Sequence, residues 1–274
     1  MGRRAELTSE ALSLGECAAR LGVHYMTVYR YVRTGMLPAR KVGAEWRVDG
    51  PDLAAFATAP RPVRSKIPAP GADRLEARLV AGDERGAWRV IEAGLAAGMT
   101  PTRVYVDMIG AAMRNIGDGW AEGSRTIADE HRASAAAHRL MGRMAGRFAA
   151  PGRPKGRVVV GAPAGERHEL PVTMVADMLR GAGFGVIDVG TDLPTGDYVA
   201  AARQAAPLTA VGISASSSKA LGGVRVLIKA LRVEGLGPIL LGGGAVLGGE
   251  HARSLGADLY AGSGPEAVAV LSSL

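Results

Sequence analysis

The sequence of 274 residues has a single cysteine, Cys17, and no apolar run that approaches the roughly 18 residues needed to cross a bilayer. One cysteine excludes an internal disulfide and a metal cluster built from several cysteines. The first residues, Met-Gly-Arg-Arg-Ala-Glu-Leu-Thr, carry charge without the apolar core of a signal peptide behind it. The glycine fingerprint of dinucleotide-binding folds, Gly-x-Gly-x-x-Gly, does not follow the apolar run at 157–162. We therefore expect a soluble cytoplasmic protein with no membrane association and no dinucleotide site.

Positive charge is concentrated at the N-terminal end of the chain. Residues 1–66 hold eleven Lys and Arg against six Asp and Glu, which is +5 of the net charge of +7. A basic cluster of this kind fits a polyanion partner. A solvated basic surface would give the same count, so charge alone leaves both interpretations open.

Residues 11–58 have the pattern of a small module of helices and one hairpin. Apolar residues at helical spacing are followed by a turn at Gly22 and a second helix that stops at Thr34-Gly35. Two short helices joined by a glycine turn are typical of a helix-turn-helix. The predicted elements are helices at 14–22 and 23–33, hairpin strands at 39–42 and 45–48, and a helix at 49–57.

This order resembles the winged helix-turn-helix of the MerR and excisionase families. The resemblance implies that double-stranded operator DNA is a partner and that the second helix enters its major groove. The sequence does not decide whether Tyr31 and Trp46 pack in the core or contact DNA. The residues expected to contact DNA are His24, Tyr25, Thr27 and Arg30 in the groove, Tyr29 or Arg33 on phosphate, and Arg40, Lys41 and Arg47 on the backbone.

The rest of the chain divides by composition. Residues 59–72 are basic and rich in proline, which predicts an extended linker between a DNA-binding domain at 1–58 and the C-terminal domains. Residues 73–150 predict a four-helix bundle with glycine breaks. Its helices are expected at 73–81, 83–97, 101–116 and about 125–149, with breaks at Gly82, Gly98 and Gly117.

Residues 151–274 alternate short apolar strands with helices. This alternation predicts a doubly wound, parallel, five-stranded α/β sheet of the flavodoxin-like kind. Strands are expected at 158–162, 185–189, 210–213, 239–241 and 259–260. Such folds bind ligands at the carboxyl edge of the sheet, so the loops there decide the function.

Glu166 and His168 lie two residues apart after the first strand of this domain. A carboxylate there can hold the imidazole ring and raise its basicity, as acids do behind metal-bound histidines. The pair therefore fits a metal ligand, but a histidine in such a loop is more often structural, so both interpretations stay open at this point. The glycines at 242–244 after the fourth strand are open between a turn, a phosphate site and close approach of a ligand.

Trp120, followed after nine residues by Glu130-His131, resembles the upper-face motif of CarH/LitR-type B12-dependent photoreceptor regulators. The loop Glu166-Arg167-His168-Glu169-Leu170-Pro171 resembles the Asp-x-His-x-x-Gly signature of B12-binding domains, with Glu for Asp and Pro for Gly. Ser214-Ala215-Ser216 and Gly242-Gly243-Gly244 stand where that family has its serine and glycine loops. The members of that family also have a winged helix, a linker, a helical cap and an α/β domain in this order along the chain.

The resemblance implies cobalamin as the cofactor, with adenosylcobalamin as the dark form and cobalt held through His168. A flat indole can pack over an organic group on cobalt, and a carboxylate can accept hydrogen bonds from ribose or adenine. His138, two turns beyond His131, is open between ligand, network member and packing. The residues expected to contact the cofactor are Trp120, Glu130, His131, Glu166, His168, Ser214, Gly242, Gly243 and Gly244.

The function that the resemblance implies is a light-responsive repressor that forms a dimer or tetramer when loaded. Ala121 departs from the family, because the residue after the tryptophan is usually a histidine that captures cobalt after photolysis. This departure favours a second hypothesis, a regulator that senses cobalamin without light. A third is a corrinoid carrier for a methyltransferase, which has no need of residues 11–58. No nucleophile stands beside an oriented base, so we do not expect an enzyme.

Overall fold

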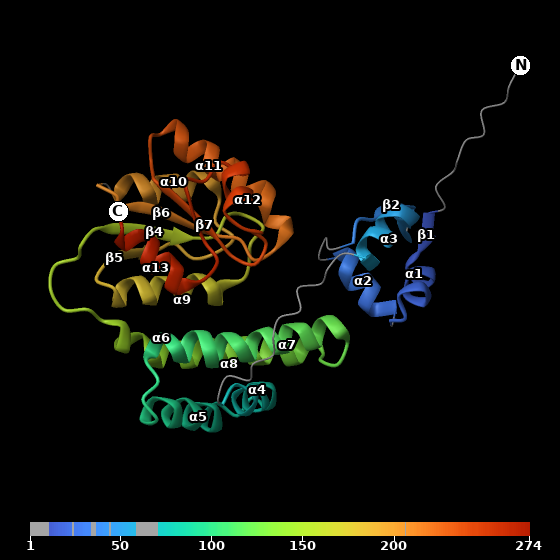
Figure 1. Cartoon of the computed structure of the whole chain (residues 1–274), viewed down its shortest axis with the longest axis horizontal. Coiled ribbons are helices and arrows are strands. Elements are labelled where there is room, and N and C mark those ends of the chain that lie inside the picture. Colours follow the sequence, from blue (N-terminus) through green and yellow to red (C-terminus); the bar gives the residue numbers. More distant parts are fainter. Residues whose placement is uncertain (1–10, 24, 34–36, 44, 59–70, 206) are drawn as a thin grey trace, which may run out of the picture. The chain divides into compact units, whose positions relative to one another are not determined.

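The computed structural model describes residues 11–23, 25–33, 37–43, 45–58, 71–205 and 207–274 (Figure 1). The chain forms two compact units, residues 1–67 with 117–127 and residues 68–116 with 128–274. Within the described ranges, no helix combines the length and the apolar character that a membrane span requires.

The N-terminal module is a three-stranded sheet with three helices. The hairpin predicted from the sequence is present, and a strand that was not predicted pairs with its other edge, giving the order β1-β3-β2. Ser13 ends this extra strand and begins the first helix with a reciprocal cap, in which its hydroxyl accepts the amide of Glu16 and the Glu16 carboxylate accepts the amide of Ser13. The elements are β1 (Ala11–Ser13), α1 (Leu14–Leu21), α2 (Tyr25–Arg33), β2 (Arg40–Val42), β3 (Glu45–Asp49) and α3 (Gly50–Thr58).

Tyr31 and Trp46, which the sequence left open, both pack partly buried against the core of this module. The ring of Tyr31 lies 4.9 Å from that of Phe56, between centroids. Both aromatic residues therefore contribute to packing in the module.

The cap is helical. Its third helix runs through Gly117 to Glu122, so the predicted break at Gly117 is wrong. A single glycine costs a helix only about 1 kcal/mol relative to alanine, and the flanking residues continue the helix. The elements are α4 (Ala72–Ala81), α5 (Glu84–Ala96), α6 (Pro101–Arg103), the π-helical turn η1 (Val104–Ile109), α7 (Gly110–Glu122), α8 (Ile127–Met144) and the 3-10 turn η2 (Ala145–Phe148).

The C-terminal domain is a parallel sheet in the order β5-β4-β6-β7-β8, which confirms the predicted flavodoxin-like fold class. The order in which strands are added reverses between β4 and β6, because β5 lies on one side of β4 and the later strands lie on the other. Doubly wound folds open a crevice for ligands at such a point. The strands are β4 (Arg157–Gly161), β5 (Gly185–Asp188), β6 (Ala210–Ser214), β7 (Ile239–Gly242) and β8 (Leu259–Ala261).

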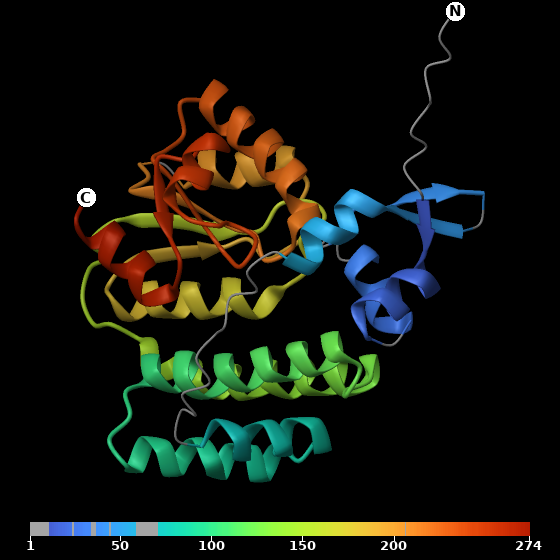
Figure 2. The same ribbon diagram turned by 45° about the vertical axis from the view of Figure 1, so that its right-hand side comes forward.

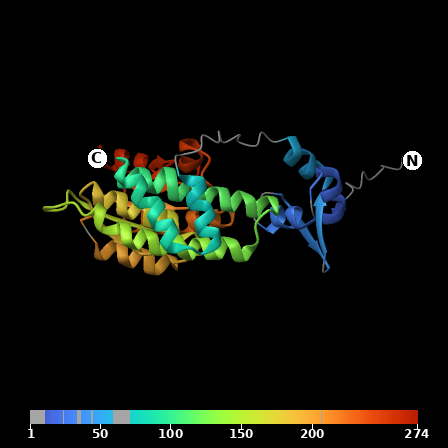
Figure 3. The ribbon, with the colours of Figure 1, turned by 90° about the horizontal axis from the view of Figure 1, so that it is seen from below.

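Helices cover both faces of this sheet (Figure 1). The face toward the cap carries α9 (Glu169–Gly181) and α13 (Gly264–Ser272), and the other face carries α10 (Thr195–Gln204), the short η3 (Ser218–Ala220), α11 (Leu221–Val233) and α12 (Gly249–Ser254). In Figure 2, α8 lies against α9, with α4 and α5 outside it. Figure 3, seen from below, has α4 and α5 nearest the viewer. Met178 of α9 belongs to the same buried cluster as the cap residues, so the cap and the sheet domain share one packed core.

Candidate functional site

Three loops gather at the carboxyl edge of the sheet, after β4, β6 and β7. Gly161, the last residue of β4, pairs in register with Ile213, and Ser214 at the end of β6 pairs with Gly242 at the end of β7. The loops that the sequence singled out therefore start side by side. His168 is the N-cap residue of α9, which packs on the same side as the cap.

The side chain of Glu166 is fully buried between these loops. Its Oε1 accepts the amide of His168 at 2.9 Å and lies 2.5 Å from the imidazole Nδ1. Its Oε2 accepts the amides of Ser216 and Ser217 at 2.6 and 2.8 Å. One carboxylate therefore joins the β4 loop to the β6 loop and fixes the orientation of the ring.

The His168 side chain is 61% exposed, although its Nδ1 is held by a buried group. When Nδ1 donates to the carboxylate, Nε2 of the same ring keeps its lone pair. A carboxylate behind a histidine whose other nitrogen is available is the arrangement found behind metal-bound histidines. These residues fit a cobalt ion held by imidazole.

Electrostatics at the pair agree with this arrangement. Burial alone raises the pKa of the Glu166 carboxyl, but hydrogen bonds from His168 and from the amide of Ser217 outweigh it and hold the pKa below its usual range. The hydrogen bond to Glu166 raises the pKa of His168, and the charge of Glu130 adds to that effect. Glu130 of the cap is therefore close enough to His168 to interact with it electrostatically.

Asp192 was missed by the sequence analysis and fixes the backbone of the β4 loop. Its carboxylate accepts the amide of Gly165 at 2.7 Å and the Arg167 guanidinium at 3.2 Å, and its own amide donates to the carbonyl of Glu166 at 2.8 Å. Asp192 has a φ of 54°, a conformation that aspartate tolerates better than most residues. That tolerance gives no sequence signal, because Asp occurs in many turns.

The glycines after β7 are required by the protein's own backbone. Gly243 has a φ of 106°, and a β-carbon there would lie 2.3 to 2.7 Å from backbone atoms of Ala215. A β-carbon at Gly242 would lie 2.5 Å from the carbonyl oxygen of Ala261. Gly244 is exposed, and its nearest neighbour would be 3.8 Å away. Gly243 therefore lets the β6 and β7 loops close on each other, and Gly242 lets the end of β7 approach β8. The predicted cofactor contacts of Ser214 and of all three glycines stay predictions.

The face of α8 that carries Glu130 and His138 lies opposite the His168 loop. Glu130 is half-buried and accepts the hydroxyl of Ser134 at 2.7 Å. His138 places Nε2 3.6 Å from the Glu169 carboxylate, directly after His168 in the chain. His131, 75% exposed and 3.6 Å from Glu130, lies off this stripe. Spacing of four residues explains the stripe, since residues at i, i+4 and i+8 share a helix face.

Trp120 lies in the last turns of α7 and is half-buried. It belongs to the segment 117–127, which groups with the N-terminal unit. Its predicted place over the cofactor stays a prediction.

The candidate DNA-binding residues are described in part. Tyr25 is 48% exposed at the start of α2, whereas His24 and the side chains of Thr27, Arg30 and Arg33 lie outside the described residues. On the hairpin, Arg40 lies 3.3 Å from Asp49 and Arg47 lies 2.7 Å from Glu45. The Lys41 ammonium lies 5.7 Å from the centre of the Trp46 ring. A carboxylate therefore partly neutralises each of the two arginines, whereas the Lys41 ammonium lies on an aromatic face.

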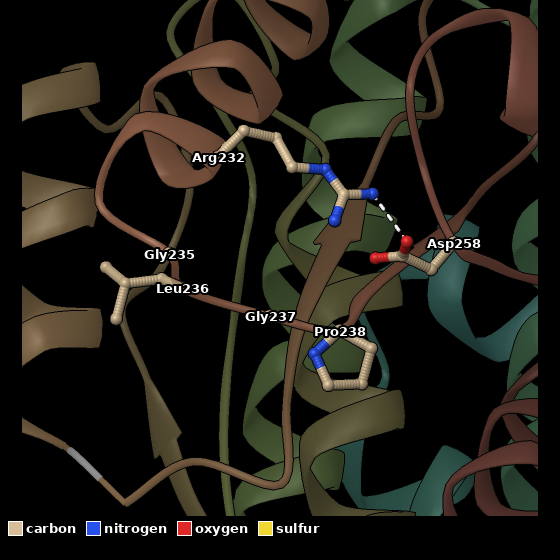
Figure 4. A pocket seen from close by; sticks show the side chains of 6 residues that line it. All are labelled: Arg232, Gly235, Leu236, Gly237, Pro238 and Asp258. Atoms are coloured by element: carbon tan, nitrogen blue, oxygen red, sulfur yellow. Dashed lines mark hydrogen bonds and ion pairs between the residues drawn. The ribbon is translucent and has the colours of Figure 1, made fainter.

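A separate hollow of about 340 Å³ lies beside Arg232 and Asp258 (Figure 4). Arg232 donates to Asp258 at 2.5 Å and to the carbonyl of Gly256 at 3.1 Å, and Asp258 accepts the amide of Ile239 at 2.7 Å. Ile239 begins β7, so this hollow lies at the amino edge of the sheet, opposite His168. Its charged groups bind each other, and we assign it a structural role.

Comparison with known proteins agrees with the geometry. Two family models, each described as a B12 binding domain, match residues 72–144 and 156–272, and a helix-turn-helix domain model matches residues 11–61. The chain is 31% identical over 190 residues to dimethylamine corrinoid protein 2 of Methanosarcina mazei, which covers 68% of this chain and 81% of that protein. It is 30% identical over 190 residues to dimethylamine corrinoid protein 1 of Methanosarcina acetivorans, which covers 68% and 82%.

The structure of the monomethylamine corrinoid protein of Methanosarcina barkeri has the same fold, with a TM-score of 0.66 and 21% sequence identity. That match covers 75% of this chain and 99% of the other. The two B12-binding matches together include the cap helices and the loops around Glu166 and His168. The chain belongs to the family of cobalamin-binding corrinoid proteins, and in it the corrinoid-binding part follows an N-terminal helix-turn-helix domain.

Proposed function

We propose that the chain is a cobalamin-dependent transcriptional repressor whose affinity for double-stranded operator DNA depends on the state of the bound corrinoid. The observation that carries the proposal is the presence, in one chain, of a helix-turn-helix match at 11–61 and two B12-binding matches outside it. A sensor that regulates transcription needs both parts. An enzyme or a carrier of small groups has no use for the first.

In this proposal His168 would hold cobalt through its second ring nitrogen, and Glu166 orients and polarises its ring. Adenosylcobalamin supplies a cobalt–carbon bond that light can break. The stripe on α8 with Glu130 and His138 covers the upper side of the site. The remaining residues that would contact the cofactor are Trp120, His131, Ser214, Gly242, Gly243 and Gly244.

Regulation then follows from a two-state equilibrium. The corrinoid stabilises one arrangement of the cap and the sheet domain, and that arrangement favours the dimer or tetramer that binds DNA. To move the DNA-competent state from about 1% to about 99%, the cofactor must bind it about 10⁴-fold more tightly than the other state. A ligand that contacts both the cap and the sheet domain can supply such a difference, because it binds well only when the two are correctly placed.

Ala121 bears on whether light is the signal. Alanine has no ligand atom, so a histidine that captures cobalt after photolysis must come from another position. His138 is better placed than His131, because it is half-buried beside Glu169 while His131 is largely exposed. The alternative is a regulator that reports the amount or the alkylation state of cobalamin in the dark.

A corrinoid carrier for a methyltransferase is the competing function. It is favoured by the relatives, which are named dimethylamine corrinoid proteins and match 68% of this chain. The helix-turn-helix domain argues against it, because specific DNA binding has no place in methyl transfer.

One experiment separates the three functions. Duplexes that bind the full-length protein are selected from a random pool, and affinity is measured by fluorescence anisotropy at physiological salt. The protein is used without cofactor and loaded with hydroxo-, methyl- or adenosylcobalamin, in darkness and after green light. We expect the adenosyl form to bind selected DNA most tightly. Loss of binding after light supports the photoreceptor, dark differences between the forms without a light effect support the cobalamin sensor, and no selective DNA binding in any state overturns the regulator.

A further inference from the structure

Tyr105 and Asp177 join the cap to the sheet domain by a buried hydrogen bond. The Tyr105 hydroxyl donates to Asp177 Oδ2 at 2.8 Å, with the carbonyl of Met141 as a second, longer acceptor at 3.2 Å. Tyr105 is 0% exposed and Asp177 is 3% exposed. Tyr105 lies on η1, Asp177 on α9 and Met141 on α8, so this hydroxyl joins η1 both to α8 of the cap and to the first helix of the sheet domain.

The local sequence holds both partners in place. Tyr105 lies in the π-helical turn, whose wider backbone is a common feature of functional sites, and its ring packs on Phe148 with centroids 4.6 Å apart. Asp177 is anchored by Arg180 at 2.8 Å. Burial and the neighbouring Asp177 carboxylate raise the pKa of the Tyr105 hydroxyl far above its usual value, so the group stays protonated and remains a donor.

This junction is connected to the cobalt ligand through two helices. α9 begins directly after His168, and Asp177 follows His168 by nine residues, or roughly 13 Å of helix. α8 carries Met141 at the junction, and it carries His138 and Glu130 one to three turns away on the face toward the His168 loop. Fixing α8 to α9 at one end therefore determines the space between them at the other.

Methionine is the most frequent residue type in the cluster shared by the cap and α9. Thioethers repack more easily than branched or aromatic side chains, so part of this packing can adjust. A hydrogen bond from a buried hydroxyl to a carboxylate is directional and is costly to break. The methionines of this cluster are Met99, Met108, Met113, Met141, Met144, Met174 and Met178.

We propose that Tyr105 is a positioning residue that, through Asp177, holds α8 over the His168 loop and so limits access to the upper face of the bound corrinoid. The inference rests on the proposed function in one respect, that cobalt is held through His168. It adds a residue that contacts neither cobalt nor DNA and that sets how far the cap opens.

The test compares two substitutions that each remove one buried hydroxyl. Tyr105→Phe keeps the ring packing and loses the bond to Asp177. Tyr198→Phe is the matched control, because Tyr198 is equally buried and its hydroxyl donates to the carbonyl of Gly212 at 2.6 Å within the sheet domain, away from the cap. Both variants are loaded with hydroxocobalamin, and the rate at which azide replaces the upper ligand is followed by visible absorption. Hydrogen exchange of the α8 and α9 amides is measured on the cofactor-free proteins.

We expect ligand exchange about tenfold faster in Tyr105→Phe than in wild type, with faster amide exchange at the α8–α9 contact. Tyr198→Phe is expected to match wild type in both measurements, and all three proteins are expected to keep the spectrum of histidine-ligated cobalt. Equal rates in the two tyrosine variants would overturn the inference.

A second variant covers the case in which Tyr105→Phe does not fold. Asp177→Asn keeps an acceptor for the hydroxyl but removes the charge, and we expect it to fall between wild type and Tyr105→Phe. If Asp177→Asn exchanges its ligand at the wild-type rate and its α8–α9 amides are equally protected, the junction does not position the cap. If the wild-type protein shows no histidine ligation, the proposed role of His168 fails, while amide exchange in the cofactor-free proteins still decides the role of Tyr105.

Discussion

The Glu166 carboxylate lies 2.5 Å from Nδ1 of His168 and at the same time accepts two amides of the loop after β6. The ring is therefore held by a group that is itself fixed to a neighbouring strand. A histidine on an exposed loop would otherwise sample several rotamers, and fixing the ring before the metal binds removes that entropic cost. The geometry makes separate predictions for the ligand, for the carboxylate and for the glycines that shape the loops.

Replacement of His168 by alanine removes the nitrogen that we assign to cobalt. We expect His168→Ala to lose the absorption features of histidine-ligated, base-off cobalamin and to bind the cofactor at least about tenfold more weakly. Visible spectroscopy and equilibrium titration with hydroxocobalamin measure both effects. Added imidazole is expected to restore part of the spectrum, because it can occupy the vacated position. A variant with the wild-type spectrum would show that another group is the ligand.

Replacement of Glu166 by glutamine tests the buried carboxylate. The amide group is of similar size, but its NH₂ cannot accept hydrogen bonds, so either the Ser216 and Ser217 amides or the His168 amide loses its acceptor. We expect the free energy of unfolding of the cofactor-free protein to fall by about 2–4 kcal/mol, measured by denaturant titration.

Glu234→Gln is the control for this change, because the Glu234 carboxylate pairs with Arg203 at the surface, at 2.7 Å. Its loss is expected to cost below about 1 kcal/mol. If the two glutamine variants are equally stable, the buried carboxylate does not hold the two loops together.

Gly243 and Gly244 are neighbours with opposite requirements. Gly243→Ala places a β-carbon against the backbone of Ala215 at a positive φ, and we expect it to lose at least about 2 kcal/mol of stability. Gly244→Ala has space and an ordinary backbone conformation, so its stability is expected to change by less than about 0.5 kcal/mol. Thermal unfolding of the two variants measures the difference. A tolerated Gly243→Ala would mean that the β6 and β7 loops can separate at low cost.

The sequence was sufficient for the sheet, because apolar strands alternate with helices. The spacing of Glu166 and His168 was a weak signal by itself and gained weight from the resemblance to B12-binding domains, and the structure places the two side chains in contact. Helix continuation through Gly117 was not predictable, since a glycine can end a helix or be tolerated inside one, and tertiary packing decides between them.

Contacts between distant residues were also outside the reach of the sequence. Tyr105 and Asp177 are 72 residues apart, and nothing local to either signals the other. β1 has three residues, too few for an alternation pattern, and it is a strand only because β3 offers a free edge. Asp192 acts through backbone amides of another loop, which any residue type can supply. These features arise from chain topology, and they include the junction that we assign to cap positioning.

The Arg232–Asp258 pair predicts a pH dependence of stability that is independent of the cofactor. Burial raises the pKa of Asp258, but hydrogen bonds from Arg232 and from the amide of Ile239 outweigh it, so the folded-state pKa lies below the usual value. A carboxyl group whose pKa is lower in the folded protein stabilises the fold at any pH above its pKa in the unfolded chain, about 3.9. That stabilisation is lost as the pH falls through the pKa of the folded state.

We therefore expect Asp258→Asn to be less stable than wild type near pH 7 and to lose less stability on acidification below about pH 4. Thermal unfolding of the cofactor-free protein between neutral and acid pH measures this. Asp197→Asn, at an exposed carboxylate on α10, is the control and is expected to follow the wild-type profile. A parallel profile for Asp258→Asn would show that the pair does not contribute to acid sensitivity.

The hairpin cations predict how DNA binding depends on salt. The carboxylates beside Arg40 and Arg47 partly cancel the attraction of these arginines for phosphate, whereas the Lys41 ammonium lies over the Trp46 ring. We expect Lys41→Ala to weaken binding to all sequences alike and to lower the slope of log affinity against log salt by about 0.9, the value for one phosphate contact. Lys229→Ala in α11, outside the DNA-binding module, is expected to change neither. Asp49→Ala removes the carboxylate beside Arg40 and is expected to raise the affinity for DNA at low salt. If Asp49→Ala leaves the affinity unchanged and Lys41→Ala leaves the salt slope unchanged, the hairpin does not contact the DNA.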